Sequence, residues 1–374
     1  MKEIRPAKIG EFDELMRLLD KCFNKSMADN YCHIYRKTPN HTAMNKIIKL
    51  NEKIASNVGV FPLSAVTNGI ELSIAGVGGI ATDPKYRGKG LMAELLSFSI
   101  KHMKDNQYDI SVLDGDRWRY GNYGWERGGR CYCFSINKSS IRDLKSYGYA
   151  IKPYSKSNIK QVINIHEKEP MRAKRTEDDY RLIFKRRKIR TFLAQNNSLI
   201  SYICLVDNNV VVEFGGDYKG LSDLILFCFR KLDIKELTIK APYVAGKNIQ
   251  LLFKLSASWY LHSSCMIKIL NMGSLLNKYL SLINKRYAEF VHRLNGELTL
   301  KSSDSGEYVS IIYGDNITLS NKITRNVLTL SDRELVILLF GIVKPGMILN
   351  LGIYRDFFNR IFPLDFYIWS SEFV

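Results

Sequence analysis

Hydrophobic residues along the chain form three stretches that differ in their spacing. In the first stretch, apolar residues recur at helical spacing over 12–23 and again over about 43–55, so both segments predict amphipathic helices. The pattern after residue 60 is that of short strands, with Asn68-Gly69 as a tight hairpin turn, and a further helix follows Gly90. The strands expected here are 60–66, 70–74, 78–82 and 110–113.

The second stretch repeats a similar order of elements without a glycine loop, and the third differs from both. Residues 151–270 predict helices at 159–165 and 221–232 and strands at 191–194, 201–206, 210–214 and 237–239. Residues 271–374 predict an antiparallel meander with strands at 298–300, 308–313 and 317–319. Ser331-x-x-Glu334 is a capping-box pattern that opens an apolar helix ending at Gly341, and an apolar tail starts at Phe362. We therefore predict an α+β protein of three domains, 1–150, 151–270 and 271–374.

Composition adds a large positive charge to this picture. The 374 residues carry 55 Lys+Arg and 37 Asp+Glu, a formal charge of +18, and the three stretches contribute +7, +10 and +1. The densest basic run is 185–190, after Arg172, Lys174, Arg175 and Arg181. Two interpretations are open, a solvated helix face and a patch that binds a polyanion. No zinc-finger spacing or glycine-aromatic RNA-binding motif accompanies the run, so we do not expect nucleic acid as a partner.

Several classes of protein are excluded by the same composition. With 46% hydrophobic and 25% charged residues, the chain is neither disordered nor fibrous. The N-terminal residues contain no apolar run, and the longest one elsewhere, 335–343, is too short for a membrane span, so we expect neither a signal peptide nor a membrane anchor. Seven cysteines without a C-x-x-C pair indicate reduced thiols in a cytoplasmic protein without a structural metal.

Candidate chemistry is concentrated in the segment from Ile80 to Met92, which runs from a strand into a helix. Gly88 and Gly90 alternate with basic residues at the turn, and glycines allow the main chain to approach a ligand closely. The start of the helix adds free N–H groups and the positive end of the helix dipole. These features predict a site for a pyrophosphate, although the spacing fits neither the Walker motif nor G-x-G-x-x-G.

Two motifs in this part of the chain resemble a known superfamily. Tyr86-Arg87-Gly88-Lys89-Gly90 is similar to the acetyl-CoA signature of the GNAT acetyltransferases, and residues 114–125, DGDRWRYGNYGW, resemble the Tyr-Gly-x-Phe/Tyr-Gly-Tyr segment of their enhanced-intracellular-survival (Eis-like) type. That type has two tandem GNAT folds, each a mixed sheet flanked by helices, and a C-terminal domain similar to sterol carrier proteins. The resemblance thus implies that 1–150 is catalytic, that 151–270 is a degenerate GNAT fold and that 271–374 is sterol-carrier-like.

The resemblance also implies a set of site residues. The first tyrosine of the second motif, Tyr120, corresponds to the general acid, and the main-chain carboxylate of the last residue, Val374, to the general base. Tyr123 is an alternative acid and Glu372 an alternative base. The residues implied to bind acetyl-CoA are Ile80, Ala81, Thr82, Arg87, Gly88, Lys89, Gly90, Leu91, Met92, Gly115 and Asp116.

The chemistry of acyl transfer needs such groups. A neutral amine attacks the thioester, a base removes a proton, and an acid protonates the departing thiolate. The resemblance thus implies transfer of an acetyl group from acetyl-CoA to a primary amine, either an aminoglycoside-like small molecule or a protein lysine. Asp114, Asp116 and Glu126 are candidates for the acidic groups that a cationic acceptor would need. The alternative is a non-catalytic protein that binds a ligand through its basic middle domain or its sterol-carrier-like domain. The resemblance also implies that the protein is a homo-oligomer, namely a hexamer.

Overall fold

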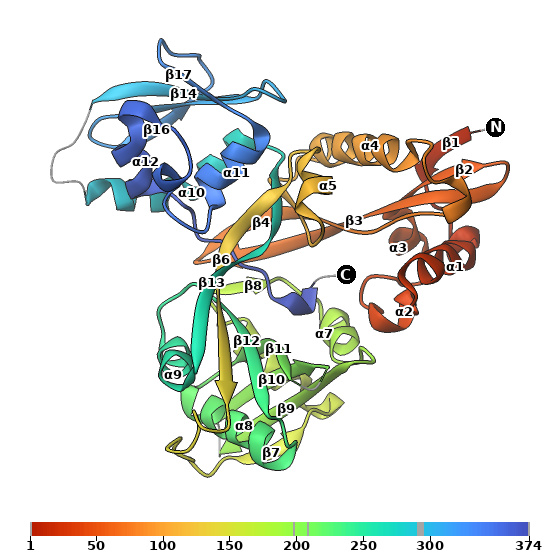
Figure 1. Cartoon of the computed structure of the whole chain (residues 1–374), viewed down its shortest axis with the longest axis vertical. Helices are drawn as coiled ribbons and strands as arrows, with labels where there is room; N and C mark the ends of the chain where they lie inside the picture. Colours follow the sequence, from red (N-terminus) through yellow and green to blue (C-terminus); the bar gives the residue numbers. More distant parts are fainter. Residues whose placement is uncertain (1, 197–198, 208, 290–294, 373–374) are drawn as a thin grey trace.

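Two sheets form the framework of the protein. The computed structural model describes residues 2–196, 199–207, 209–289 and 295–372. Thirteen strands of these residues form one mixed sheet in the order β1-β2-β3-β4-β5-β13-β6-β12-β11-β10-β9-β7, with β8 paired to β3. A second sheet has the order β16-β15-β14-β17. The predicted α+β fold, with a large mixed sheet flanked by helices, is confirmed (Figure 1).

The first part of the chain supplies half of the large sheet, and α4 and α1 cover its two faces. Apolar side chains alternate along β3, so that Val58 and Val60 pack under α4 whereas Phe61 packs with α1. The elements are β1 (Lys2–Pro6), α1 (Phe12–Phe23), α2 (Met27–Asn30), α3 (Pro39–Ala43), β2 (Asn45–Leu50), β3 (Lys53–Thr67), β4 (Ile70–Thr82), α4 (Leu91–Asp105), β5 (Ile110–Leu113), α5 (Arg117–Gly121) and β6 (Glu126–Asn137).

The second part repeats the same order around a second parallel pair. β11 and β12 are parallel and are joined through α8, as β4 and β5 are joined through α4. The elements are β7 (Ala150–Pro153), α6 (Ile159–His166), β8 (Met171–Ala173), α7 (Glu177–Ile183), β9 (Ile189–Asn196), β10 (Leu199–Val206), β11 (Val210–Gly215), α8 (Tyr218–Lys231), β12 (Glu236–Pro242), α9 (Lys247–Leu255) and β13 (Ser258–Ile269).

The two repeats exchange one long strand each. β13, from the second part, pairs with β5 of the first, and β6, from the first part, pairs with β12 of the second. β6 and β13 also pair with each other from Glu126–Ile267 to Ser135–Ser258 and run through the centre of the molecule (Figure 1). A boundary drawn at residue 150 therefore separates two parts of the sequence whose strands lie in one continuous sheet.

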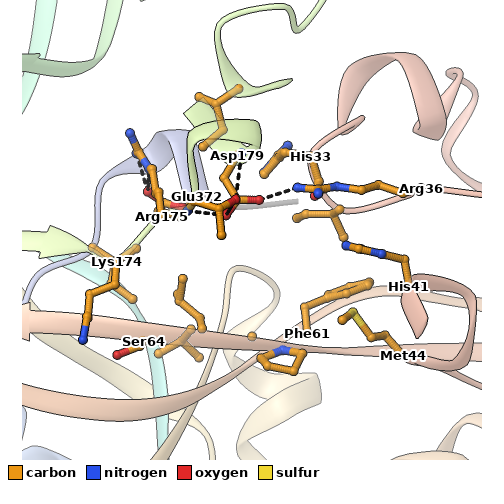
Figure 2. Close-up of a pocket in the computed structure, with 18 of the residues that line it drawn as sticks. His33, Arg36, His41, Met44, Phe61, Ser64, Lys174, Arg175, Asp179 and Glu372 are labelled. Carbon is orange, nitrogen blue, oxygen red and sulfur yellow. Dashed lines mark hydrogen bonds and ion pairs between the residues drawn. The ribbon is translucent and has the colours of Figure 1, made fainter. Parts of the chain in front are cut away.

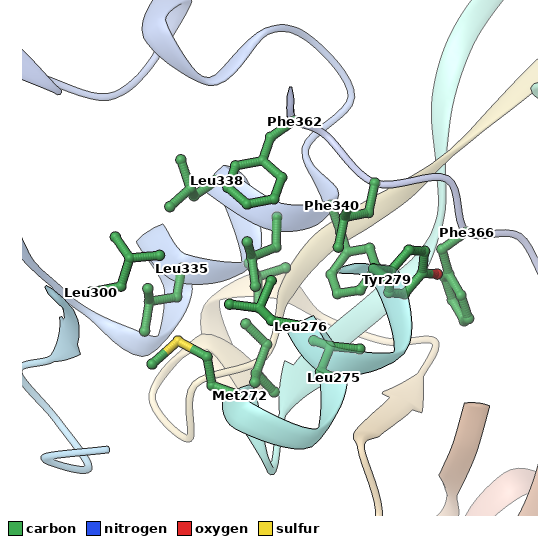
Figure 3. Packing of buried hydrophobic residues seen from close by; sticks show 14 of the residues in the cluster. Met272, Leu275, Leu276, Tyr279, Leu300, Leu335, Leu338, Phe340, Phe362 and Phe366 are labelled. Atoms are coloured by element: carbon green, nitrogen blue, oxygen red, sulfur yellow. The ribbon is translucent and has the colours of Figure 1, made fainter. Parts of the chain in front are cut away.

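The third part is a four-stranded sheet covered by helices, and its core continues into the large sheet. Met272 and Tyr279 of α10 pack with Phe340 of α11 and with Phe362 and Phe366 of the tail (Figure 3). Burial of each such side chain contributes about 1.5–3 kcal/mol. The elements are α10 (Met272–Ala288), β14 (Gly296–Ser302), β15 (Tyr308–Tyr313), β16 (Ile317–Ser320), β17 (Val327–Leu330), α11 (Asp332–Phe340) and α12 (Arg355–Ile361). Short 3-10 turns lie at Ile9–Glu11, Pro84–Tyr86, Lys156–Asn158, Pro345–Met347, Gly352–Tyr354 and Ser370–Glu372.

Two expectations about the first part were wrong. The helix expected over 43–55 is instead strand β2 and the start of β3, because the apolar residues there pack between neighbouring strands. Asn51 and Glu52 make the turn between these strands with φ of 47° and 64°. The strands expected at 70–74 and 78–82 are one strand, β4, with an irregularity in its pairing with β3 near Gly78.

Most other predicted elements are present. The hairpin at Asn68-Gly69 has φ of 50° and 86°, as a turn with two left-handed residues requires. The capping box is formed, since Ser331 Oγ accepts from the Glu334 N–H and the Glu334 side chain accepts from the Ser331 N–H. None of the helices in the described part of the chain is long and apolar enough to cross a bilayer. The seven cysteines are free thiols.

Candidate active site

Strands β4 and β5 are paired for only a short distance and then separate. Their last facing residues are Gly76 and Val112. β5 ends one residue later, whereas β4 continues to Thr82 and stays paired with β3 along its other edge. The edge of β4 over 77–82 thus carries main-chain groups to which no strand in the described part of the chain is bonded. Free N–H and C=O groups on a strand edge can bind an extended polar ligand as another strand would.

The loop after β4 presents the open end of a long helix. Gly90 is the N-cap of α4 with φ 73°, and no side chain caps the helix there. Gly88 also has a left-handed φ of 77°, which other residues adopt only at a cost. The first N–H groups of α4 are consequently free to bind an anion at the positive end of the helix dipole. The helix that follows the second parallel pair differs, because the Asp217 carboxylate caps α8 by accepting from the Lys219 N–H at 2.8 Å.

A pocket of about 600 Å³ connects the free edge of β4 with this helix end; we call it the β4–α4 pocket. It brings together all predicted binding residues of the strand, the loop and the helix, and adds side chains from α1 and from the tyrosine motif. Its lining is Cys22, Phe23, Ile80, Ala81, Thr82, Tyr86, Arg87, Gly88, Lys89, Gly90, Leu91, Met92, Ala93, Arg119 and Tyr123.

Three cations give the β4–α4 pocket a positive wall. Arg87 donates its Nε–H to the Thr82 carbonyl oxygen at 3.3 Å, which holds the guanidinium beside the loop. The Lys89 ammonium lies 5.6 Å from the centre of the Tyr86 ring. Arg119 comes from α5 on the opposite side and was not predicted. A site of this charge, size and extended form suits a ligand with phosphates at one end and a polar chain at the other.

Tyr120 lies next to this pocket and is packed in the core below it. Its side chain is 8% exposed and belongs to the cluster that contains Val77 and Leu113, one residue from each of the two separating strands. Gly115 makes room for the ring, since a Cβ atom there would be 2.4 Å from a Tyr120 ring carbon. Burial raises the pKa of Tyr120, and the Arg119 charge offsets this only in part, so the phenol is protonated at neutral pH.

The other residues of the tyrosine motif have different positions. Tyr123 lines the β4–α4 pocket, whereas Gly115 and Asp116 are not among the residues that line it. Asp116 instead caps α5, because its carboxylate accepts from the Arg119 N–H at 2.6 Å. Gly115 serves the packing of Tyr120.

The three acidic residues of this region do not form an acidic pocket. Glu126 is buried between Arg117 and Arg333, with which it makes ion pairs. The Asp114 carboxylate lies 3.5 Å from Arg127, and the Asp116 carboxylate caps the N-terminus of α5. The expectation that these residues could receive a cationic acceptor therefore lacks support from their geometry.

A second cavity, of about 350 Å³, lies between the two repeats; we call it the central pocket (Figure 2). It reaches the point where β4 and β5 separate, through Gly76, Val77 and Val112. Much of its surface is apolar, and the tail of the chain forms one wall. The lining is His33, Ile34, Arg36, His41, Met44, Phe61, Pro62, Leu63, Ser64, Gly76, Val77, Val112, Lys174, Arg175, Thr176, Asp179, Ile183, Ile368 and Glu372.

Charged groups of the central pocket neutralise one another. Arg36 forms an ion pair with Asp179, and Arg175 forms one with Glu372 (Figure 2). Burial raises the pKa of Glu372, and the Arg175 charge opposes that shift. His33 is buried, and burial together with the nearby arginines lowers its pKa well below the usual value, so the imidazole is neutral. Neither carboxylate of the lining is thus left for a polycation.

The predicted base lies outside the described residues, because these end at Glu372, two positions before Val374. Glu372 itself lines the central pocket. The basic run at 185–190 proves to be heterogeneous. Arg186 is largely buried and donates to the carbonyl oxygens of Asn30 and Ser371, whereas Lys185, Arg187, Lys188 and Arg190 are exposed.

Sequence reasoning did not identify the walls of the central pocket. Arg36, Arg175 and Asp179 come from segments about 140 residues apart, and no spacing within one motif relates them. The sequence offered two signals, the basic segment 172–175, which predicted a solvated face or a polyanion patch, and Glu372, the alternative base.

Comparison with known proteins identifies the domain at the start of the chain. Residues 3–128 match the family model described as an acetyltransferase (GNAT) domain. These residues form a GNAT acetyltransferase domain. They contain β4, the Arg87–Gly90 loop and the tyrosine motif, so the sequence resemblance to the GNAT acetyltransferases is confirmed for this part of the chain. No sequence relative of established function is found at a significant level.

Solved structures show that the likeness extends over the whole chain. A probable N-acyltransferase from Enterococcus faecalis is 14% identical, with 99% of each chain covered and a TM-score of 0.76. A GCN5-related N-acetyltransferase from Anabaena variabilis is 16% identical, and Eis1 from Mycobacterium abscessus 9%; both comparisons cover 100% of each chain, with TM-scores of 0.73 and 0.69. The chain thus has an Eis-like fold from end to end.

Proposed function

We propose that this enzyme transfers an acetyl group from acetyl-CoA to a primary amine. One observation carries the proposal: the central pocket reaches β4 where it separates from β5, at Gly76 and Val77, and the β4–α4 pocket follows further along the same strand, at Ile80–Thr82. A thioester bound along the free edge of β4 would present its carbonyl near Val77, where the central pocket opens. Proximity of this kind is a large part of the catalysis of acyl transfer.

The cosubstrate is held by the groups of the β4–α4 pocket. The N–H groups at the start of α4 bind the pyrophosphate, with Arg87 and Lys89 as counter-charges. The main chain of Ile80–Thr82 binds the pantetheine arm. Gly115 and Asp116 act indirectly, through the packing of Tyr120 and the capping of α5.

The reaction requires one acid and one base. The amine nitrogen attacks the thioester carbon, a base takes the proton that the nitrogen loses, the C–S bond breaks, and the thiolate of CoA takes a proton from the acid. We assign the acid to Tyr120, whose raised pKa keeps the phenol protonated, with Tyr123 as the alternative. We assign the base to the main-chain carboxylate of Val374, because Ile368 and Glu372 bring the tail to the central pocket. Glu372 is the alternative base, although its ion pair with Arg175 makes its carboxylate less available.

The acceptor is best described as an amine with a single positive charge and an apolar body, such as a protein lysine or a small monoamine. Support comes from the apolar lining, with Phe61, Leu63 and Ile183, and from the pairing of both lining carboxylates with arginines. An aminoglycoside carries several ammonium groups, each of which would lose its hydration without gaining a free carboxylate.

The test is thiol release from acetyl-CoA with a panel of amines. We expect turnover with lysine peptides and aliphatic or aromatic monoamines, and a kcat/KM at least tenfold lower for aminoglycosides. A protein that shows neither turnover with any amine nor a thermal shift with acetyl-CoA would favour the alternative, a non-catalytic binding protein.

The division into domains 1–150, 151–270 and 271–374, the sterol-carrier likeness of the last, and a hexameric assembly remain proposals. Support for the division is the repeated strand–helix order and the separate four-stranded sheet. Light scattering coupled to size exclusion would measure the assembly.

A further inference from the structure

The tail of the chain is attached to the second repeat by a buried network of polar groups. Arg175 donates its Nε–H to Glu372 Oε1 at 2.6 Å and an Nη2–H to Ser371 Oγ at 3.0 Å. Arg186 donates to the Ser371 carbonyl oxygen at 2.8 Å, and Trp369 donates its indole N–H to the Met171 carbonyl oxygen at 3.2 Å. Two side chains and one main-chain carbonyl of the second repeat therefore bind the tail at Trp369, Ser371 and Glu372.

Arg175 is the centre of this network. Its side chain is 1% exposed and lies between Glu213 and Glu372, whose side chains are 0% and 6% exposed. Nη1 donates to Glu213 Oε1 at 3.0 Å, and Tyr202 donates its hydroxyl to the same oxygen at 2.7 Å. Burial tends to raise the pKa of Glu213, but the Arg175 charge outweighs this effect and lowers it to about 2. One guanidinium thus forms ion pairs with a carboxylate of the second repeat and a carboxylate of the tail at the same time.

The same cluster could at first be mistaken for a metal site. Ligand atoms of His166, Glu213 and Glu372 all lie within 4.8 Å of one another. The guanidinium of Arg175, however, already bonds both carboxylates. Burial and the Arg175 charge lower the pKa of His166 to about 3, so the ring is neutral. The guanidinium of Arg175 therefore takes the place that a metal cation would occupy between Glu213 and Glu372.

The network lies on the acceptor side of the enzyme alone. Arg175, Ile368 and Glu372 line the central pocket, and none of them is among the residues that line the β4–α4 pocket. Arg186 also connects the tail to the first repeat, because its Nε–H donates to the Asn30 carbonyl oxygen at 2.8 Å. A loss of this network should therefore alter the wall of the central pocket and leave the β4–α4 pocket unchanged.

We propose that Arg175 is a positioning residue that holds the tail in the wall of the acceptor site, and that the second repeat serves the reaction as the support of this wall. The proposal rests on the proposed function, because the acceptor site is assigned there. It also gives a role to part of the positive charge on 151–270, since Arg175 and Arg186 act as counter-ions and donors for the tail.

The test compares two variants with a matched control. Arg175→Met alone would leave two buried carboxylates unpaired and could prevent folding. The double variant Arg175→Met/Glu213→Gln removes both charges of the second repeat, and Glu372 can then take a proton, since burial already raises its pKa. Arg175→Lys keeps the charge but loses the planar fork that joins three partners. Arg181→Met is the control, because this exposed arginine of α7 forms its ion pairs with Glu177 and Asp178 of the same helix.

Two measurements distinguish a failure of the proposed role of Arg175 from a failure of the proposed acetyltransferase function. Hydrogen exchange of a peptide that covers 364–372 reports the attachment of the tail without any need for activity, and we expect exchange at least tenfold faster in the double variant. In acetyl transfer we expect kcat/KM for the amine to fall at least tenfold, because the tail forms a wall of the acceptor site and carries the proposed base, with the Kd of CoA unchanged within twofold. We expect a smaller fall in Arg175→Lys and none in Arg181→Met.

Each outcome has one meaning. Unchanged exchange in the double variant overturns the attachment, and an unchanged kcat/KM for the amine, or an equal loss of affinity for CoA, overturns the positioning role. A wild-type protein that binds CoA but acetylates no amine contradicts the proposed function, while the exchange experiment still decides whether Arg175 holds the tail.

Discussion

Gly76 of β4 faces Val112 of β5 in the last pair before the two strands separate. Both residues line the central pocket, and the strand beyond Gly76 leads into the β4–α4 pocket. A ligand in one pocket and a ligand in the other would therefore meet beside this pair.

The first prediction concerns the end of α4. Gly90→Ala places a Cβ in open space, so its cost comes from the left-handed φ of 73°, at about 1–2 kcal/mol. If the loop relaxes to relieve that strain, the N–H groups at the start of α4 move, and we expect the Kd of CoA by calorimetry to rise about tenfold. Gly10→Ala is the control, since it also meets no atom within 4 Å and has no left-handed φ. Equal affinities in the two variants would contradict the anion-binding role of the loop.

The second prediction distinguishes the two tyrosines. Tyr120→Phe removes the proposed acid and should lower kcat by about 10²-fold, with little change in the affinity for CoA. Tyr123→Phe removes a hydroxyl from the lining of the β4–α4 pocket and should lower kcat less than fivefold. The measurement is steady-state kinetics with a monoamine. The reverse order of effects would transfer the acid role to Tyr123.

The third prediction concerns the end of the chain. Deletion of Val374 or addition of a C-terminal tag moves or removes the proposed base, so kcat should fall about 10²-fold. Glu372→Gln keeps the chain end and should retain more activity than the deletion. Full activity in a tagged protein would refute the base role of the terminal carboxylate, and a larger loss in Glu372→Gln would assign that role to Glu372.

The fourth prediction concerns stability against pH. Burial raises the pKa of Glu169 from 4.5 to about 7, although the Gly216 N–H donates to its carboxylate at 3.2 Å. The folded protein thus binds this proton more tightly than the unfolded chain does. The resulting stability is fully present below about pH 4.5 and is lost as the pH rises to about 7, an effect of about 1–3 kcal/mol.

The measurement for Glu169 is urea unfolding at pH 5 and pH 8. Glu169→Gln resembles the protonated carboxyl, so its free energy of unfolding should exceed that of the wild type at pH 8 and match it at pH 5. Glu167→Gln, at an exposed position nearby, is the control and should differ little at either pH. Parallel pH profiles of the wild type and Glu169→Gln would disprove the raised pKa.

Local patterns in the sequence predicted those elements whose bonds are local. The hairpin at Asn68-Gly69, the helix after Gly90 and the capping box at Ser331 each depend on residues within a few positions of one another. The β4–α4 pocket was largely predictable for the same reason, because a strand, a loop and a helix in direct succession form most of it. The helix expected over 43–55 failed because strand partners, rather than local spacing, decide the conformation there.

Features that depend on distant pairing were beyond such patterns. β13 lies between β5 and β6, although more than 120 residues separate it from either strand along the chain. No pattern within 258–269 indicates which strands it pairs with. The central pocket has the same origin, since Arg36 meets Asp179 and Arg175 meets Glu372 only after the sheet has formed. The effect of burial on Glu169, Glu213 and His166 likewise requires the folded structure.

The exchange of β6 and β13 also bears on how the chain can fold as it leaves the ribosome. The edge of β5 that receives β13 stays open until residue 269 has been made, and β6 has no final neighbour before β12 and β13 follow. The first repeat therefore cannot complete its sheet as an early, independent step, in contrast to proteins whose N-terminal domain folds first during synthesis. Long-range pairing of this kind favours slow, concerted assembly of both repeats. Until then, the apolar faces of both repeats would be exposed together, which makes the nascent chain a natural client for chaperones.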